Sequence, residues 1–218
     1  MNGRGHPSRW RLYGITDERC SRGRSHLEVA EAAIRGGADV IQLRDKEASG
    51  GRLYEVALSL RKLTRDAGIP FLVNDRLDVA MAVDADGVHL GQEDLPASAA
   101  RRILGPGKLL GVSAETEEAA LLAERDGADY LGVGPVFEAR GTKPDAGTPR
   151  GLARVSRIRA ASRLPIVAIG GIDAGNARQV LEAGADAVAV ISAVVSADDI
   201  EEAARRLKRS LGGREDGE

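Results

Sequence analysis

The sequence predicts a single α/β domain folded as a closed (β/α)8 barrel, the TIM-barrel class, and three observations carry that prediction. Short apolar segments alternate with helical segments eight times along the 218 residues. The apolar segments have no polar face, which is typical of parallel strands covered by helices. A short Gly-containing unit ending near an Asp recurs directly before four of them. Eight such units at this length fit a barrel near the lower end of the size range.

The recurring unit marks where a helix ends and a strand begins. It reads GGAD at 36–39, DGAD at 126–129 and AGAD at 183–186, with a looser version, DADG, at 84–87. In each case Gly suits the left-handed position after a helix, and apolar residues follow almost at once. We therefore expect these units to lie together at the amino ends of their strands.

The same alternation places every element. We expect strands near 11–16, 39–44, 71–74, 87–90, 109–113, 130–134, 166–170 and 187–191. We expect helices near 24–36, 51–67, 76–83, 96–104, 115–126, 151–161, 174–183 and 198–211. An open doubly wound sheet is the alternative, but the turn after the first strand lacks the Gly-rich dinucleotide fingerprint. The catalytic domain is expected over 11–211, with residues 1–10 and 212–218 disordered.

Composition excludes several classes of function. Lys and Arg number 31 against 33 acidic residues, a net charge of -2, so nothing favours nucleic acid or a membrane as partner. The one cysteine, Cys20, excludes a disulfide framework and a Cys-rich metal site. No apolar run approaches the about 18 residues of a membrane span, and we find no signal peptide. We expect a cytoplasmic protein that binds small molecules, and a homodimer stays open.

The second predicted strand ends in a group of cations. Gln42, Arg44 and Lys46 share one face of the strand, while Ile41 and Leu43 share the other. An inward Arg needs an anion to offset its desolvation, so we expect these side chains to clamp an anionic ligand at the barrel mouth. The alternative is a set of surface salt bridges, for instance with Asp45.

Two carboxylates follow the next two strands. Adjacent strands lie about 4.8 Å apart, so Asp75 and Asp94 could reach one ion. Mg²⁺ takes one or two carboxylates together with water and phosphate oxygens. The alternative is that both residues are helix N-caps. His89 is expected to pack inside its strand and not to bind the metal.

The remaining strand ends are suited to phosphate. Ser113, after the fifth strand, can donate to a phosphate or cap a helix. The long connection 135–150 carries Arg140, Gly141, Thr142 and Lys143, which could close over an anion or be merely solvated. Gly170-Gly171 and Ile191-Ser192 end strands seven and eight, the usual phosphate site of such barrels. The mouth is therefore expected to hold two anion sites, as transfer between two phosphorylated substrates requires.

As an ordered set, these segments resemble the thiamine phosphate synthase family over nearly the whole chain. The matching segments are YGITD at 13–17, QLRDK at 42–46, VNDR at 73–76, HLGQED at 89–94, GVS at 111–113, DYLGVGP at 129–135, TK at 142–143, AIGGI at 168–172 and VIS at 190–192. The resemblance implies a TIM barrel that couples hydroxymethylpyrimidine diphosphate to a carboxythiazole phosphate with Mg²⁺ and releases pyrophosphate.

Carried over by position, the resemblance also assigns residues. The residues implied to hold the pyrimidine diphosphate are Gln42, Leu43, Arg44, Asp45, Lys46, Asn74, Ser113 and Lys143. Those implied to hold the thiazole phosphate are Arg140, Gly141, Thr142, Gly171, Ile191 and Ser192. Asp75 and Asp94 would bind Mg²⁺, and Arg44, Lys46, Ser113 and Lys143 would act on the reacting groups.

Arg140 is a departure, because the family motif usually has Thr there. This departure keeps open a related thiazole tautomerase, which would have no use for the metal site. Two more distant alternatives are a non-catalytic phosphate-binding regulator and a sugar-phosphate isomerase. The five charged residues Arg44, Lys46, Asp75, Asp94 and Lys143 speak against the regulator, and the isomerase would need an acid–base pair that we do not find.

Overall fold

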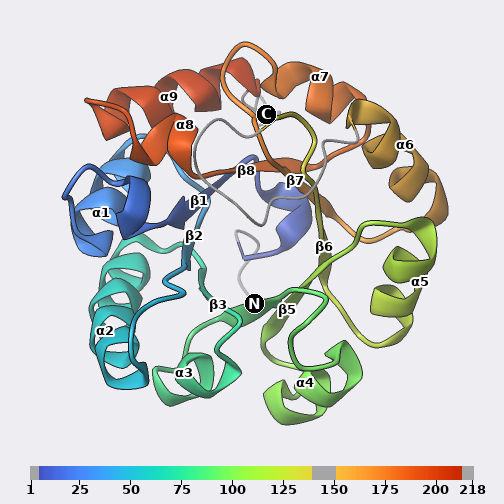
Figure 1. Cartoon of the computed structure of the whole chain (residues 1–218), viewed down its shortest axis with the longest axis horizontal. Coiled ribbons are helices and arrows are strands. Elements are labelled where there is room, and N and C mark those ends of the chain that lie inside the picture. The colour runs from blue at the N-terminus through green and yellow to red at the C-terminus, as the bar shows by residue number, and fades with distance from the viewer. Residues whose placement is uncertain (1–4, 139–150, 213–218) are drawn as a thin grey trace, which may run out of the picture.

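The computed structural model describes residues 5–138 and 151–212, and the predicted barrel is confirmed there. Its strands are parallel and pair in chain order, and β8 pairs with β1 to close the sheet (Figure 1). The strands are β1 (Leu12–Thr16), β2 (Val40–Leu43), β3 (Phe71–Asn74), β4 (Gly87–Leu90), β5 (Leu109–Ser113), β6 (Tyr130–Val133), β7 (Ile166–Ile169) and β8 (Ala187–Val190). Each lies within about one residue of its expected position.

Helices form the outer ring seen in Figure 1. They are α1 (His26–Arg35), α2 (Gly50–Ala67), α3 (Leu77–Ala82), α4 (Ala97–Leu104), α5 (Glu117–Arg125), α6 (Gly151–Ala161), α7 (Ala177–Glu182), α8 (Ser192–Val195) and α9 (Ile200–Ser210). Three short elements were not expected from the sequence: α8 and the two 3-10 helices η1 (Pro7–Arg9) and η2 (Glu18–Cys20). Each is a single turn with too few residues to show a helical period.

The Asp of each recurring unit joins two strands at their amino ends. One carboxylate oxygen accepts a backbone N–H from the strand before it, at 2.7–2.9 Å, and the Asp backbone N–H donates back to the same residue. The four pairs are Asp39 with Leu12, Asp86 with Phe71, Asp129 with Leu110 and Asp186 with Ile166. A cation from an outer helix neutralises each Asp: Lys208, Arg61, Arg101 and Arg159, respectively. The unit therefore locks β1–β2, β3–β4, β5–β6 and β7–β8 in register.

The N-terminal segment is a correction to the sequence-based expectation. Residues 1–10 were expected to be disordered, but Pro7–Arg9 form the 3-10 helix η1 and Trp10 is fully buried. The indole packs edge-on against Tyr13 and Tyr130, with ring centroids 5.6 and 5.3 Å away. Burying an aromatic ring stabilises the fold enough to order the residues attached to it. Residues 1–4 and 213–218 of the expected disordered ends lie outside the described residues.

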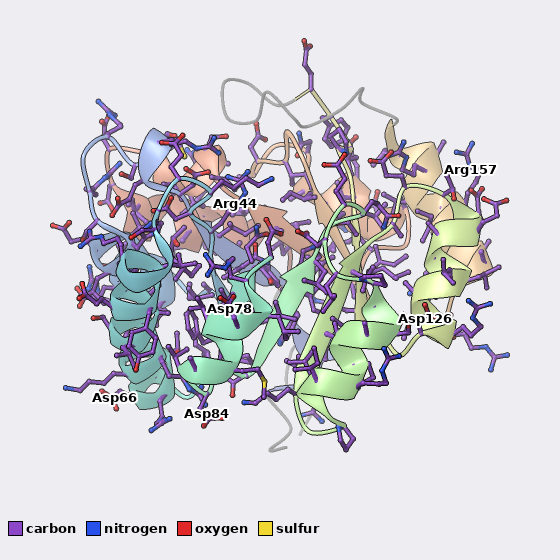
Figure 2. The ribbon with its side chains drawn as sticks, turned by 60° about the horizontal axis from the view of Figure 1, so that its bottom comes forward. Arg44, Asp66, Asp78, Asp84, Asp126 and Arg157 are labelled. Atoms are coloured by element: carbon purple, nitrogen blue, oxygen red, sulfur yellow. The ribbon has the colours of Figure 1, made fainter. Side chains whose placement is uncertain are left out.

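The two ends of the barrel differ in chemistry. Figure 2 shows Arg44 near the carboxyl ends of the strands, whereas Asp66 and Asp84 lie at the opposite end. The amino end is closed by the Asp–cation pairs and by Trp10. Functional groups are therefore sought at the carboxyl end, as is usual for this architecture.

Candidate active site

Two adjoining cavities open at the carboxyl ends of the strands. The smaller, about 430 Å³, is lined mainly by β1 to β6 and the loops after them, and it contains Arg44, Lys46, Asp75 and Asp94. The larger, about 650 Å³, lies over β5 to β8 and is lined mainly by the loops after β6, β7 and β8. Ser113, Glu115, Gly132, Ile169 and Ala189 line both cavities. The barrel mouth therefore offers two compartments that meet near Ser113.

The cationic side of the smaller cavity comes from β2 and the loop after it. Gln42, Arg44 and Lys46 line it, as the alternation along the strand predicts. Leu43 is fully buried and does not line it. Asp45 also stays off the wall: its Oδ1 accepts the N–H groups of residues 47 and 48 at 3.0 Å, and its Oδ2 lies 3.5 Å from His26 Nε2.

Arg44 already has a protein anion beside it. Its Nη1 donates to Asp17 Oδ2 at 2.5 Å, and both side chains are buried. Arg19 also binds this carboxylate. Burial by itself would raise the pKa of Asp17, but the hydrogen bonds from Arg19 and the charge of Arg44 outweigh it and hold that pKa below its usual value. Desolvation of Arg44 therefore does not by itself require a bound anion, although the residue faces the cavity.

The structure brings Asp75 and Asp94 together on the other side of the same cavity. Burial and the neighbouring carboxylate of Asp94 raise the pKa of Asp75 to about 6, although Lys46 and Arg44 partly oppose this. Asp75 also has a positive φ of 61°. This strained placement of two like charges is typical of a site that takes a cation.

Helix capping does not explain the two carboxylates. Helix α3 has Arg76 at its N-cap and α4 has Pro96, and neither cap makes a side-chain hydrogen bond. Asp94 Oδ2 instead accepts the N–H of Gly91 at 2.6 Å, within its own loop. The N-cap alternative is therefore wrong for both residues.

A hydrogen-bonded chain crosses the floor of the smaller cavity. Gln42 Nε2 donates to the Tyr13 hydroxyl at 2.7 Å, which lies 3.0 Å from the Tyr130 hydroxyl. Tyr130 lies 3.0 Å from His89 Nδ1, and His89 Nε2 lies 3.1 Å from Ser113 Oγ. The sequence predicted that His89 packs inside the barrel, but its partners and both tyrosines were missed. Each comes from a different strand, so no local pattern could join them.

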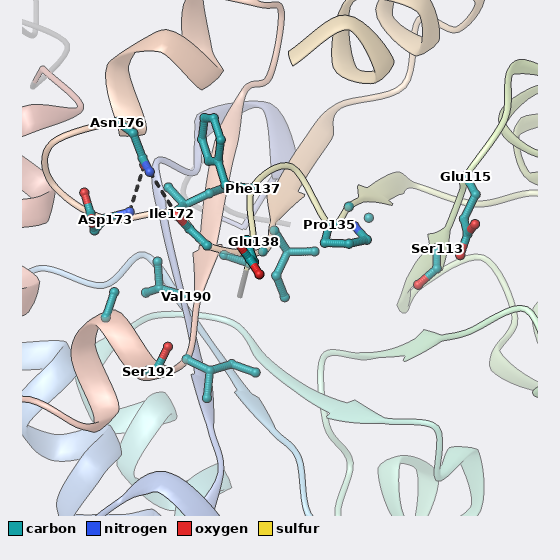
Figure 3. Close-up of a pocket in the computed structure, with 18 of the residues that line it drawn as sticks. Ser113, Glu115, Pro135, Phe137, Glu138, Ile172, Asp173, Asn176, Val190 and Ser192 are labelled. Carbon is teal, nitrogen blue, oxygen red and sulfur yellow. Dashed lines mark hydrogen bonds between the residues drawn. The ribbon is translucent and has the colours of Figure 1, made fainter. Parts of the chain in front are cut away.

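The wall of the larger cavity is built from the glycine-rich loop after β7 and the start of α8. Gly171, Ile191 and Ser192 line it, as the sequence predicted. Gly171 has a φ of +63°, and a Cβ there would lie 2.5 Å from the Glu138 carbonyl oxygen, so only Gly fits. Asn176, which the sequence reading missed, holds the loop by donating to the Gly171 carbonyl at 2.9 Å (Figure 3).

Some of the predicted residues cannot be placed. Arg140, Gly141, Thr142 and Lys143 lie outside the described residues. Asn74 ends β3 and lines the smaller cavity, as expected. No helix within residues 5–138 and 151–212 is long and apolar enough to cross a membrane.

Comparison with known proteins matches this architecture to one family. A family model described as thiamine monophosphate synthase matches residues 12–194. The chain is 61% identical to a thiamine-phosphate synthase of Chloroflexus aurantiacus over 91% of both chains, and 56% identical to one of Moorella thermoacetica over 91% of this chain and 94% of the other. A solved thiamine phosphate pyrophosphorylase from Pyrococcus furiosus superposes with a TM-score of 0.86 at 44% identity, covering 94% of this chain and 96% of that one. The chain therefore belongs to the thiamine monophosphate synthase family.

Proposed function

We propose that the chain is a thiamine-phosphate synthase, a transferase that couples hydroxymethylpyrimidine diphosphate to a carboxythiazole phosphate and releases pyrophosphate. The observation that carries the proposal is the pair of adjoining cavities, one with cations and carboxylates and one with glycine-rich loops. The diphosphate belongs in the first, and the monophosphate belongs against the backbone of the second. Family membership supports the same reaction.

The reaction needs little from the protein beyond positioning and charge. The thiazole nitrogen forms a bond to the pyrimidine methylene carbon, and the bond from that carbon to the diphosphate oxygen breaks. The carboxylate of the thiazole leaves as CO2 and the thiazole part takes up one proton, so the organic product is thiamine phosphate. The oxygen leaves with the bonding electrons, so negative charge grows on the diphosphate. Arg44 and Lys46, which line the diphosphate side, stabilise that charge. Ser113, on the wall shared by the two cavities, lies where the substrates meet.

Asp75 and Asp94 fit a magnesium ion. The donors are carboxylate oxygens, which Mg²⁺ prefers, and their mutual repulsion in a half-buried site is relieved by a cation. When bound there, Mg²⁺ would neutralise diphosphate oxygens and favour departure of the leaving group. The two aspartates would hold the ion, and Lys46 and Arg44 would complete the positive side.

Several parts of the expected site stay predictions. Lys143 is expected to contact the diphosphate, and Arg140, Gly141 and Thr142 are expected to contact the thiazole phosphate. Leu43 and Asp45 would act only by shaping the backbone between Gln42 and Lys46, since neither lines the cavity. Cytoplasmic location and a homodimeric state are likewise predictions.

The decisive experiment supplies purified protein with both substrates and Mg²⁺ and follows pyrophosphate release together with thiamine phosphate formation. The synthase forms the two products in equal amounts and needs both substrates. A thiazole tautomerase would convert the thiazole alone without metal, and a regulator would bind phosphates without turnover. Either result would replace the proposed reaction.

A further inference from the structure

The hydrogen-bonded chain on the cavity floor can run in one direction, with each side chain donating to the next one. Five side chains, Gln42, Tyr13, Tyr130, His89 and Ser113, follow one another at 2.7–3.1 Å. They come from β2, β1, β6, β4 and β5, so the chain spans the barrel interior. A tyrosine hydroxyl carries one proton, and a neutral imidazole carries one on either nitrogen.

The direction follows from its first member. Gln42 donates through Nε2, so the Tyr13 oxygen accepts from it. The 3.0 Å contact between the two tyrosine hydroxyls allows either to donate, and in a chain that runs from Gln42 to Ser113 it is Tyr13 that donates to Tyr130. Tyr130 in turn donates its own proton to His89 Nδ1, 3.0 Å away. His89 then carries its proton on Nε2 and donates it to Ser113 Oγ. The Ser113 proton is directed away from His89.

We infer that Tyr13, Tyr130 and His89 are positioning residues that make Ser113 a hydrogen-bond donor to the substrate where the two cavities meet. When Ser113 Oγ accepts from His89, its own O–H is left to donate to another acceptor, and a diphosphate oxygen is such an acceptor. The inference rests on the proposed function only for the identity of that acceptor. The direction of the chain concerns the free protein and is tested there without substrate.

The packing around the chain holds the side chains of Tyr130 and His89 in place. A Cβ on Gly111 would lie 2.1 Å from the Tyr130 ring and 2.5 Å from His89 Nδ1. A Cβ on Gly132 would lie 2.7 Å from His89 Cε1. Both glycines therefore leave the space that Tyr130 and His89 occupy. The rings are fixed by contact on the β5 and β6 sides, so the hydrogen bonds have little freedom to rearrange.

Each tyrosine can accept one hydrogen bond and donate the next only while its hydroxyl keeps its proton. Burial raises the pKa of Tyr13 and that of Tyr130 above the usual value, so both keep their protons at neutral pH. Either ionised tyrosine would become a pure acceptor and break the sequence of donors. The environment thus favours the neutral chain.

The first experiment reads the His89 tautomer in the substrate-free protein. Protein labelled with ¹⁵N-histidine is examined by NMR near pH 8.5, about two units above the ordinary histidine pKa. His89→Gln assigns its signals among the three histidines. We expect one tautomer, with the proton on Nε2. Tyr130→Phe removes the donor to Nδ1, so we expect a mixture of tautomers, whereas Tyr54→Phe, at an exposed position of helix α2, leaves the signals unchanged.

The second experiment tests the effect on Ser113 during turnover. Tyr130→Phe should lower kcat roughly fivefold to tenfold, the effect of one net hydrogen bond. In the Tyr130→Phe/Ser113→Ala double variant, turnover should equal that of Ser113→Ala alone, because the network acts through Ser113. Tyr54→Phe supplies the control for turnover as well. Additive losses would mean that Tyr130 acts independently of Ser113 and would overturn the inference.

The two readouts separate the possible failures. If the wild-type tautomer carries its proton on Nδ1, the direction is reversed and the inference is wrong, whatever reaction the protein catalyses. If the tautomer is as expected but no thiamine phosphate forms, the proposed function fails and the network stands. Should Tyr130→Phe not fold, Gln42→Leu removes the donor at the far end, and the same mixture of tautomers is expected. An unchanged tautomer in a folded Gln42→Leu would count against the inference.

Discussion

The Arg44 guanidinium is paired with Asp17 in a position where both side chains are almost fully buried, at 2% and 3% exposure. Arg44 follows β2 and Asp17 follows β1, so the pair ties two neighbouring strands together at the mouth of the cavity. The pair holds Arg44 in place before any ligand arrives. Preorganised charge of this kind needs no rearrangement when a diphosphate binds.

Asp17→Asn should therefore destabilise the protein as well as its site. Removing one partner of a buried pair leaves an uncompensated charge and costs about 3–5 kcal/mol. Urea unfolding followed by circular dichroism measures the change. The matched control is Asp198→Asn, which breaks the exposed pair with Arg22 and should cost less than about 1 kcal/mol. Equal losses in the two variants would show that burial of the Arg44 pair has no energetic consequence.

Lys46→Ala should separate the two substrates. Lys46 lines only the smaller of the two cavities, so its loss should raise the KM for the pyrimidine diphosphate roughly tenfold, the value of one charge-assisted hydrogen bond. The KM for the thiazole phosphate should change less than about twofold, because substitutions at separate sites affect one another by only about 0.3–0.5 kcal/mol. Lys62→Ala, on the exposed side of α2, is the control. Parallel increases in both KM values would contradict the assignment of one substrate to each cavity.

The fold was largely predictable because its signals are local. Apolar strands without a polar face, and helices ending in Gly, recur often enough to give all eight units. The role of the Asp in each unit was not predictable, since its carboxylate accepts a hydrogen bond from the preceding strand, as Asp186 does from the N–H of Ile166. Trp10 was missed for the same reason: its partners Tyr13 and Tyr130 are brought together only by closing the barrel.

The site was predictable in part. Alternation along β2 correctly placed Gln42, Arg44 and Lys46 on the cavity wall. It could not reveal Asp17, which lies at the end of another strand. Asp17 supplies the anion beside Arg44 that was expected to come from a ligand. Capping preferences gave a wrong alternative for Asp75, because the helix begins one residue later than that alternative needs and its N-cap residue is Arg76.

Asp75→Asn should stabilise the metal-free protein while removing its response to Mg²⁺. The folded pKa of about 6 lies above the ordinary Asp pKa of 3.8, so the folded state binds more protons between these pH values. Stability therefore falls as pH rises through this window, and the penalty is complete above about pH 6. Asn removes the penalty, and thermal unfolding at pH 7.5 without metal should give a higher Tm.

The control for this substitution is Asp78→Asn, three residues away on α3. A hydrogen bond from Arg76 lowers the pKa of Asp78, so its loss should lower the Tm slightly. Added Mg²⁺ should raise the Tm of the wild type and of Asp78→Asn by mass action, but not that of Asp75→Asn. EDTA should stop turnover of the wild type. A Tm rise with Mg²⁺ in Asp75→Asn would mean that the ion binds elsewhere.

Gly171→Ala should damage the thiazole side selectively. The new Cβ would lie 2.5 Å from the Glu138 carbonyl oxygen, and the φ of +63° disfavours a side chain, so the loop after β7 must shift. A shift of even about 1 Å in a positioning loop can cost two orders of magnitude in rate. We therefore expect kcat/KM for the thiazole phosphate to fall roughly tenfold to a hundredfold, while binding of the pyrimidine diphosphate, measured by calorimetry, stays near the wild-type value.

The control is Gly51→Ala at the start of α2, where no atom lies within 4 Å and Ala is the better helix former, so neither constant should change. If Gly171→Ala bound and turned over the thiazole phosphate normally, the glycine loop would not be the monophosphate site. The phosphate would then have to be assigned to Ser192, which also lines the larger cavity.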